Sequence, residues 1–232
     1  MSATLDPVSP STHDPSDPPA PRPGRGWVLA GVGAGLAGIA SIVGSSMSGA
    51  VYDEDNYGDP QKVADAMSEL VPQLLVFHTA TMVSCALLVV FAAGLHRQLR
   101  RRTGTESLLP GVAAGGLGLV AVAQLMGAGL TTEFAFAFQA PDGAIAPESV
   151  TFFGHWIGTV PWLWGGAGLT ALALAAASLR RGAYPRWIGW TSVVLGGLTA
   201  FFLVSPAQYM AGMTGPVWLT VVALGLLRTS EA

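Results

Sequence analysis

The chain has 232 residues, of which 51% are hydrophobic and only 11% are charged, with a formal net charge of −3 at pH 7. An ordinary soluble domain carries about twice that share of charged residues, so the composition excludes a water-soluble globular protein with a charged surface. The basic residues are few and form no basic domain, so we expect no nucleic-acid partner.

The N-terminal segment, residues 1–26, holds seven prolines among serine, threonine and aspartate residues. A segment of this composition cannot bury enough apolar surface to offset the entropy lost on ordering. It also lacks the short apolar run and small-residue cleavage site of a secretory signal. We therefore expect a disordered cytoplasmic tail, with membrane insertion beginning at the first apolar segment.

Six apolar segments follow the tail, each close to the roughly 20 residues that a helix needs to cross a hydrocarbon core of about 30 Å. They are residues 27–49, 71–95, 108–132, 150–179, 187–205 and 211–227. Because lipid offers no hydrogen bonds to backbone groups, each crossing segment must be helical. The sequence predicts an all-α, polytopic membrane protein with six transmembrane helices in a domain covering residues 27–228.

The positions of the arginines predict how these helices are oriented. They precede the first segment, separate the second from the third and the fourth from the fifth, and follow the sixth: Arg22, Arg25, Arg97, Arg100, Arg101, Arg102, Arg180, Arg181, Arg186 and Arg228. These four places alternate onto one side of the membrane, which the positive-inside rule makes cytoplasmic. Both termini are then cytoplasmic, and Lys62 is the only basic residue expected on the other side.

Most acidic residues fall in two predicted outer loops, residues 50–70 and 133–149. Within the first, Asp53–Asp59 resembles the start of a calcium-binding loop. Tyr57 and Ala64, however, occupy two positions where that loop requires ligands, the second of them a bidentate glutamate. We therefore expect a solvated acidic loop in preference to a calcium site.

The first outer loop also predicts a short helix. Asp59 followed by Pro60 is typical of a helix start, and Val63, Met67 and Leu70 would then lie on one apolar face. Such a helix would lie on the outer membrane surface or pack over the mouth of the bundle. The two outer loops together are expected to form a small lid.

Polar side chains inside the crossing segments are the candidate site residues. His78, His155 and Glu133 are predicted at similar depths in the outer half of the membrane, with Gln124 deeper in the third helix. Such groups are costly in lipid, so they usually face the bundle interior and mark a functional site. Trp162 follows His155 by seven residues, which places both on one face of a continuous helix.

Several roles remain open for these residues. The two histidines could bind a haem from opposite sides, or they could hold a divalent metal together with Glu133. They could also bind or protonate a small substrate beneath the lid. The alternative is that each histidine only makes a hydrogen bond between helices, since no single helix carries a metal-ligand spacing. The cofactor and any catalytic residue therefore stay unassigned.

Small residues and one proline shape the predicted helices. Gly31, Gly35 and Gly38 in the first helix, and Gly111, Gly115 and Gly118 in the third, would let helix backbones approach closely. We expect these faces to pack within the chain; a homo-oligomer or a partner membrane protein is the alternative. Pro161, followed by glycines, predicts a kink in the fourth helix. No charged residue lies in the middle of a crossing, which argues against an ion-coupled carrier.

The stretch from about Leu87 to Leu227 resembles multi-pass membrane proteins of actinobacteria whose function is unknown. The resemblance rests on LLVVFAAGLHRQLR, GAGLTTEFAFAF, WIGTVPWLWGGAGL, RRGAYPRWIGWTSVVLGGLTA and SPAQYMAGMTGPVWL. It implies a polytopic protein and supplies no catalytic residues. Arginine outnumbers lysine ten to one, which also indicates a bacterial source and a bacterial cytoplasmic membrane.

Three functions follow from these features. The first is a non-enzymatic membrane protein that binds a lipid, a small molecule or a partner protein, which asks least of the residues. The second is a haem- or metal-containing redox protein that uses His78 and His155. The third is a small uncoupled transporter or channel, for which the kink at Pro161 and the glycine-rich helices give mild support.

Overall fold

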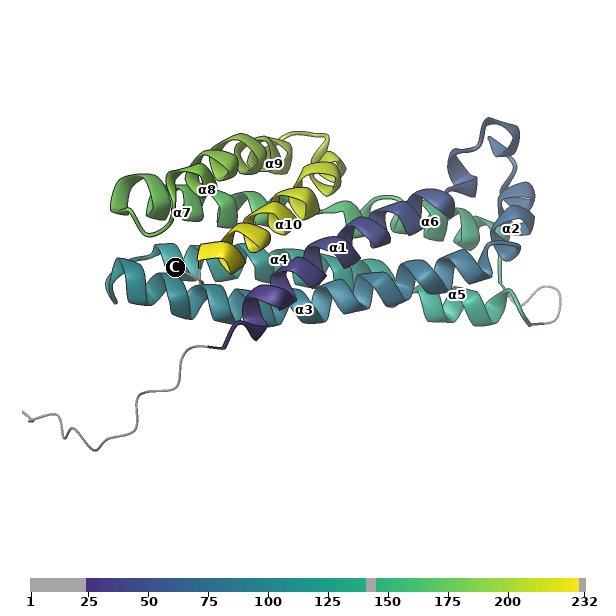
Figure 1. Cartoon of the computed structure of the whole chain (residues 1–232). Coiled ribbons are helices and arrows are strands. Elements are labelled where there is room, and N and C mark those ends of the chain that lie inside the picture. Colours follow the sequence, from purple (N-terminus) through teal and green to yellow (C-terminus); the bar gives the residue numbers. More distant parts are fainter. Residues whose placement is uncertain (1–23, 141–144, 230–232) are drawn as a thin grey trace, which may run out of the picture.

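The computed structural model describes residues 24–140 and 145–229 of the chain. Every regular element in these two ranges is a helix, which confirms the predicted all-α fold (Figure 1). Most of the predicted tail, and the Pro141 turn of the second outer loop, lie outside the described residues.

Six helical stretches are long and apolar enough to cross a membrane. They are Gly26–Met47, Val71–Thr103, Leu109–Ala137, Pro147–Arg181, Arg186–Val204 and Gln208–Thr229. Each begins within three residues of its predicted start, because length and apolar composition alone decide where a crossing helix is needed. The chain is therefore a multi-pass integral membrane protein.

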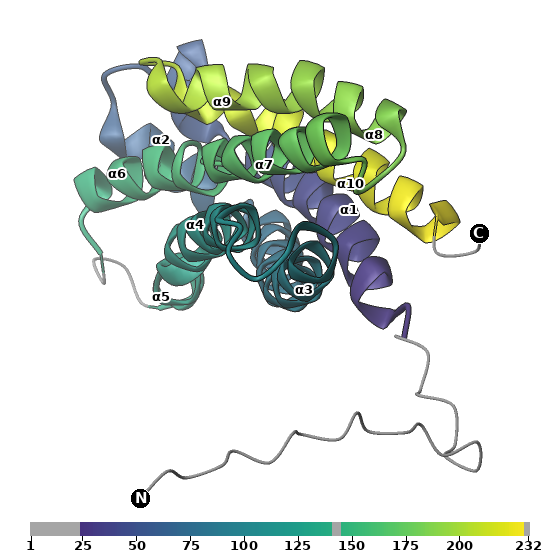
Figure 2. The same ribbon diagram turned by 90° about the vertical axis from the view of Figure 1, so that its left-hand side faces the viewer.

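Long helices form the centre of the bundle (Figure 2). Helix α1 (Gly26–Met47) packs against α3 (Val71–Thr103) and α10 (Ala211–Thr229), while α4 (Leu109–Gly129) lies between α3 and α7 (Gly165–Arg181). These helices enclose one buried cluster, the bundle core. Its larger members include Phe91, Leu95, Leu117, Trp164 and Trp218.

The fifth crossing consists of three helical pieces in sequence. Helix α8 (Arg186–Thr191) continues through a π-helical turn (Ser192–Gly196) into α9 (Gly197–Val204). All three pieces pack against α7, and a short 3₁₀ turn, η5 (Gln208–Met210), then leads into α10.

Glycines in α1 serve packing within the chain, as predicted. A Cβ at Gly31 would overlap the ring of Phe91, and one at Gly38 would overlap the indole of Trp164. Gly35 lies in the same way against α10. Close helix approach replaces the hydrophobic effect as the source of helix association in lipid.

The glycines of α4 contradict the same prediction. Outside the neighbouring residues and backbone of α4, no atom of residues 24–140 and 145–229 lies within 4 Å of where a Cβ would sit at Gly111, Gly115 or Gly118, so this face has no packing partner in the described part of the chain. The contact is made instead by Gly116, whose added Cβ would overlap the backbone of Gly166 in α7. The spacing is correct for helix packing, but the face that packs is rotated from the predicted one.

The fourth crossing is broken as well as bent. Helix α6 (Pro147–Ile157) ends before a 3₁₀ turn, η3 (Val160–Trp162), and α7 begins only at Gly165. Pro161 lies in that turn, and its ring packs where Gly127 of α4 has no side chain. The predicted kink is therefore confirmed, and it is large enough to end one helix and start another.

The two acidic outer loops are largely helical. The first contains η1 (Ala50–Tyr52), η2 (Glu54–Asn56) and α2 (Pro60–Ser68), and the second begins with α5 (Thr131–Ala137), which extends the third crossing. The predicted start of α2 is confirmed, because Asp59 Oδ1 accepts hydrogen bonds from two backbone N–H groups of its first turn at 3.1 and 3.2 Å.

These outer elements share a second buried cluster, separate from the bundle core. Its members are Val51, Val63, Met67, Leu74, Phe77, Phe134, Val150, Phe153 and Ile157. The rings of Phe134 and Phe153 stack with centroids 4.2 Å apart. We call the assembly of η1, η2, α2, α5, α6 and the first turns of α3 the outer cap. It has an apolar core of its own.

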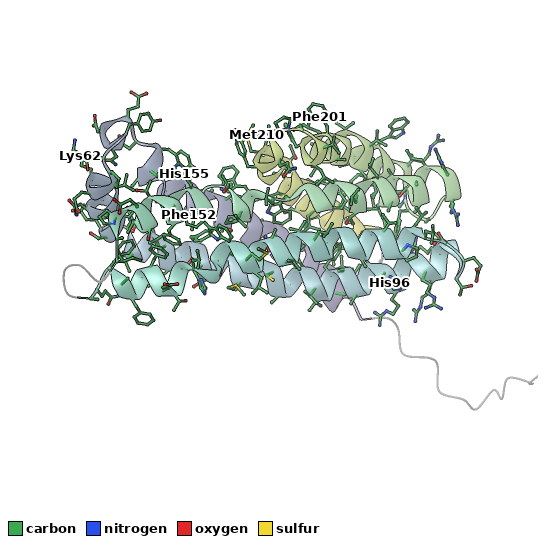
Figure 3. All side chains as sticks on the ribbon, turned by 180° about the vertical axis from the view of Figure 1, so that it is seen from behind. Lys62, His96, Phe152, His155, Phe201 and Met210 are labelled. Carbon is green, nitrogen blue, oxygen red and sulfur yellow. The ribbon has the colours of Figure 1, made fainter. Side chains whose placement is uncertain are left out.

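Helix lengths place the outer cap beyond the ends of the last two crossings. At 1.5 Å per residue, the 19 residues of α10 span about 28 Å, close to the hydrocarbon thickness, whereas the 33 residues of α3 span about 50 Å. Figure 3 agrees: Met210, between α9 and α10, lies part-way along the molecule, and His155 and Lys62 lie beyond it toward the cap. His96 lies toward the opposite end.

Candidate functional site

Two cavities lie where the outer cap meets the bundle. The cap cavity has a volume of about 380 Å³ and is lined by Val51, Tyr52, Asn56, Tyr57, Gly58, Asp59, Pro60, Val63, Thr151 and His155. The belt cavity has a volume of about 430 Å³ and is lined by Tyr52, Gly158, Thr159, Trp162 and Tyr209. Tyr52 belongs to both walls and therefore stands between them.

Tyr52 is positioned by the glycines of the fourth crossing. A Cβ at Gly158 would lie 2.5 Å from the Tyr52 hydroxyl oxygen, and one at Gly154 would lie 2.9 Å from Val51 Cβ. The absence of both side chains lets η1 lie directly against α6. The Tyr52 ring then meets the imidazole of His155 edge-on, with centroids 5.4 Å apart.

Tyr52 has a neutral phenol, and its surroundings disfavour ionisation further. Partial burial raises the pKa of its phenol above the usual value, and the nearby Tyr209 raises that pKa further. The hydroxyl is therefore protonated at neutral pH and able to donate a hydrogen bond. Tyr52 thus offers an apolar ring and a polar tip to either cavity.

Trp162 is fixed on the wall of the belt cavity by a chain of hydrogen bonds. Its Nε1–H donates to Ser45 Oγ at 3.0 Å, and the Ser45 hydroxyl donates to the carbonyl oxygen of Ile157 at 2.6 Å. The indole N–H has no second proton to donate, so the contribution of Trp162 to the cavity is its apolar face.

His155 and Trp162 do not share a helical face. Helix α6 ends at Ile157, and the break that follows turns the chain before Trp162. His155 is exposed and lines the cap cavity, while Trp162 lines the belt cavity. The prediction of one shared face is wrong. Each residue nevertheless lines one of the two cavities whose walls share Tyr52.

The other three candidate residues lie elsewhere. His78 is half-buried, with Nδ1 3.2 Å from the carbonyl oxygen of Ala128, so it makes the hydrogen bond between helices that was one of the open alternatives. Glu133 is exposed on α5. Gln124 is fully buried within the bundle, where its amide nitrogen donates to Ser84 Oγ at 3.1 Å.

The structure does not assemble the predicted metal set. Within residues 24–140 and 145–229, no three His, Cys, Asp or Glu side chains are grouped so that they could hold a metal ion, so His78, His155 and Glu133 do not converge. The imidazoles also have different neighbours, a carbonyl of α4 for His78 and the ring of Tyr52 for His155. Two carboxylates of the first outer loop, those of Asp53 and Asp59, cap the starts of η2 and α2.

Tyr52, Gly158 and Tyr209 were not predicted as site residues from the sequence. A signal for the two tyrosines was present, because Tyr52 follows the end of the first crossing and Tyr209 lies at the start of the last. Tyrosine at the outer end of a crossing is typical of the membrane interface. Gly158 carried no such signal, since its role depends on a contact with a residue 106 positions earlier.

Comparison with protein-family models, with curated proteins and with solved structures finds no match to this chain. The polytopic architecture that the actinobacterial resemblance implies is present. Membership of that family, the bacterial source and the identity of the membrane stay predictions.

Proposed function

We propose that this protein binds a lipid-like, amphipathic molecule at the outer membrane surface, without converting it chemically. The observation that carries the proposal is the pair of cavities on either side of Tyr52. Their walls share Tyr52 and carry aromatic and polar groups at the junction of bundle and cap.

The depth of the belt cavity supports an amphipathic ligand. The length of α10 by itself matches the hydrocarbon thickness, so its two ends lie near the two membrane surfaces. The turn that carries Tyr209 directly precedes α10 and therefore lies near the level where headgroups meet acyl chains. Tyr52, Trp162 and Tyr209 offer ring faces suited to an acyl chain or another apolar body. The hydroxyls of the two tyrosines suit its polar end.

The cap cavity supports a polar group that is neutral or cationic. It is lined by Asn56, Asp59, Thr151 and His155, and the surrounding loop is acidic, with Lys62 as its one basic residue. An anionic headgroup would meet like charges there, which opposes binding. The ligand would then have its apolar part in the belt cavity and its polar part in the cap cavity.

Conduction has less support than binding. Below the two cavities, the centre of the bundle is filled by buried side chains, among them Trp164, which is 0% exposed, and Trp218, which is 1% exposed. Close packing of this kind leaves no continuous path for a solute in the observed conformation. The turn that contains Pro161 also places Trp162 on the wall of the belt cavity.

The test uses a photoactivatable phosphatidylcholine, with its reactive group near the glycerol, in nanodiscs containing the full chain. We expect the lipid to crosslink most strongly to the segments around Tyr52, Thr159 and Tyr209, as mapped by mass spectrometry. Thr159→Trp fills the belt cavity and should abolish most of these adducts. The matched control Thr79→Trp changes an exposed threonine of α3 and should leave them unchanged.

Adducts spread evenly over the lipid-facing helices would contradict the proposal, because annular lipid labels without a site. Unchanged labelling in the Thr159→Trp variant would contradict it equally. Tyr52→Phe provides a milder variant, since it keeps the ring and removes only the hydroxyl. That variant should still form adducts at the site but bind the lipid headgroup more weakly.

A further inference from the structure

A groove of about 550 Å³ lies at the opposite end of the molecule, between the end of α3, the turn from α7 to α8 and the end of α10. Arg102, Tyr184, Trp187 and Arg228 are the side chains of its wall that carry charge or an aromatic ring. Among the described residues that line it, none is acidic. The groove therefore combines two positive charges with two aromatic rings.

Tyr184 is the unusual member of this wall. Only 5% of the residue is exposed, and its hydroxyl has no hydrogen-bond partner in the described part of the chain. Burial keeps this phenol protonated, so the hydroxyl is a donor without an acceptor. A buried polar group left unpaired costs free energy, and an acceptor oxygen bound in the groove that Tyr184 lines would relieve this cost.

Arg102 is held in place beside Tyr184. Its Nη1 donates to the carbonyl oxygen of Ala183, and its guanidinium carbon lies 4.6 Å from the centre of the Tyr184 ring. That hydrogen bond engages one of the five N–H donors of the guanidinium. The others remain for a second acceptor, and arginine suits the oxygens of a phosphate particularly well.

Trp187 indicates that the ligand comes from the membrane. It is 45% exposed, and its ring packs where Gly225 of α10 has no side chain. An exposed indole next to arginines at the end of crossing helices is typical of the membrane–water interface. Basic pockets between transmembrane helices at that level bind anionic lipid headgroups.

We propose that this groove binds the phosphate of an anionic phospholipid. Arg102 and Arg228 supply the charge, the Tyr184 hydroxyl donates a hydrogen bond to a phosphate oxygen, and Trp187 lies beside the glycerol region. The site is independent of the outer cavities, because it lies at the other end of the bundle and selects the opposite headgroup charge.

The test measures binding of phosphatidylglycerol to the detergent-purified full chain by native mass spectrometry. In Arg102→Gln/Arg228→Gln we expect affinity to fall roughly 25-fold, about fivefold for each arginine near an anionic headgroup. Arg97→Gln/Arg101→Gln also removes two positive charges, both near the same end of the molecule. Neither arginine lines the groove. That control should lose far less, and equal losses in the two double variants would overturn the proposal.

Two single variants guard against loss of the fold. Arg228→Gln leaves the contacts of Arg102 intact and should weaken binding about fivefold. Tyr184→Phe removes only the unpaired hydroxyl, so without anionic lipid its melting temperature should equal or exceed that of the wild type. With phosphatidylglycerol present, the gain in melting temperature should be smaller than in the wild type. An undiminished gain would remove Tyr184 from the site and overturn the proposal.

Titration with inorganic phosphate distinguishes a phospholipid headgroup from a soluble anion as the ligand of the groove. Phosphate titrated into the same detergent sample should leave the melting temperature unchanged, because it cannot use the interfacial position of Trp187. If phosphate stabilises the wild type and phosphatidylglycerol does not, the groove serves a soluble anion and the lipid assignment is wrong.

Discussion

Tyr184 is a side chain whose environment should be measurable through pH. Burial raises the pKa of its phenol to about 12, although the neighbouring Arg102 acts in the opposite direction. An unfolded tyrosine ionises near pH 10, so between about pH 10 and pH 12 the folded chain keeps a proton that the unfolded chain releases. Folding stability is therefore complete below pH 10 and falls as the pH rises through this window.

Thermal unfolding between pH 8 and pH 12, followed by tryptophan fluorescence, tests this expectation. The melting temperature of the wild type should fall above about pH 10, and Tyr184→Phe should flatten that fall because the variant has no phenol to ionise there. Tyr57→Phe is the matched control, since Tyr57 is 65% exposed. An identical alkaline fall in all three proteins would contradict the burial of Tyr184.

At the scale of single residues, the sequence indicated which side chains are unusual but not which residues they contact. His78 and Gln124 could be recognised as polar groups within crossing helices, because such groups are rare in lipid. Their partners, Ala128 and Ser84, lie 50 and 40 residues away, and no local pattern indicates them. Tyr52 could be recognised as an interfacial tyrosine, but its place in the site depends on its contact with the distant Gly158.

Helix α4 shows how one element uses two glycine faces differently. Gly116 lies so close to the backbone of α7 that an added methyl group would overlap the carbonyl oxygen of Gly166, while Gly115 has open space around it. Gly116→Ala should therefore lower the free energy of unfolding by about 1–3 kcal/mol through overpacking. Gly115→Ala should be neutral or stabilising by up to about 1 kcal/mol, because alanine is the better helix former.

Unfolding by a denaturing detergent, followed by circular dichroism, compares these two neighbouring variants. Equal effects at both positions would mean that α4 is rotated from the observed orientation. A loss at Gly115 that depends on protein concentration would instead show that its open face packs against another copy. That outcome would support the homo-oligomer that the glycine spacing left open.

Whole elements were the most predictable part of the molecule. Six crossings follow from length and apolar composition, which are properties of each segment by itself. The outer cap did not follow, because its core joins Val51 and Met67 of the first loop to Phe134 and Phe153 of the second. Each loop alone has too few apolar residues for a core, so the sequence suggested a lid where the structure has a packed helical layer.

The whole molecule has opposite charge at its two ends. The last turns of α3 and α7 carry Arg100–Arg102 and Arg180–Arg181, and Arg228 ends α10, so these arginines gather at one end of the bundle. The outer cap carries acidic residues and Lys62. The positive-inside rule predicts that the arginine end faces the cytoplasm. Both proposed sites depend on this predicted orientation, which would expose the anionic-lipid groove to the cytoplasmic leaflet.

Single-cysteine labelling of intact cells tests this orientation. Cys85 is the only cysteine, so Cys85→Ser gives an unreactive parent to which Tyr57→Cys in the cap or Thr105→Cys in the turn after α3 is added. A membrane-impermeant maleimide should label the Tyr57→Cys variant in intact cells and the Thr105→Cys variant only after permeabilisation. The reverse pattern would invert the molecule, and labelling of both variants in intact cells would show that the arginines do not set one orientation. In either case the outer cavities would no longer be confined to the outer surface, and the groove would no longer be confined to the cytoplasmic leaflet.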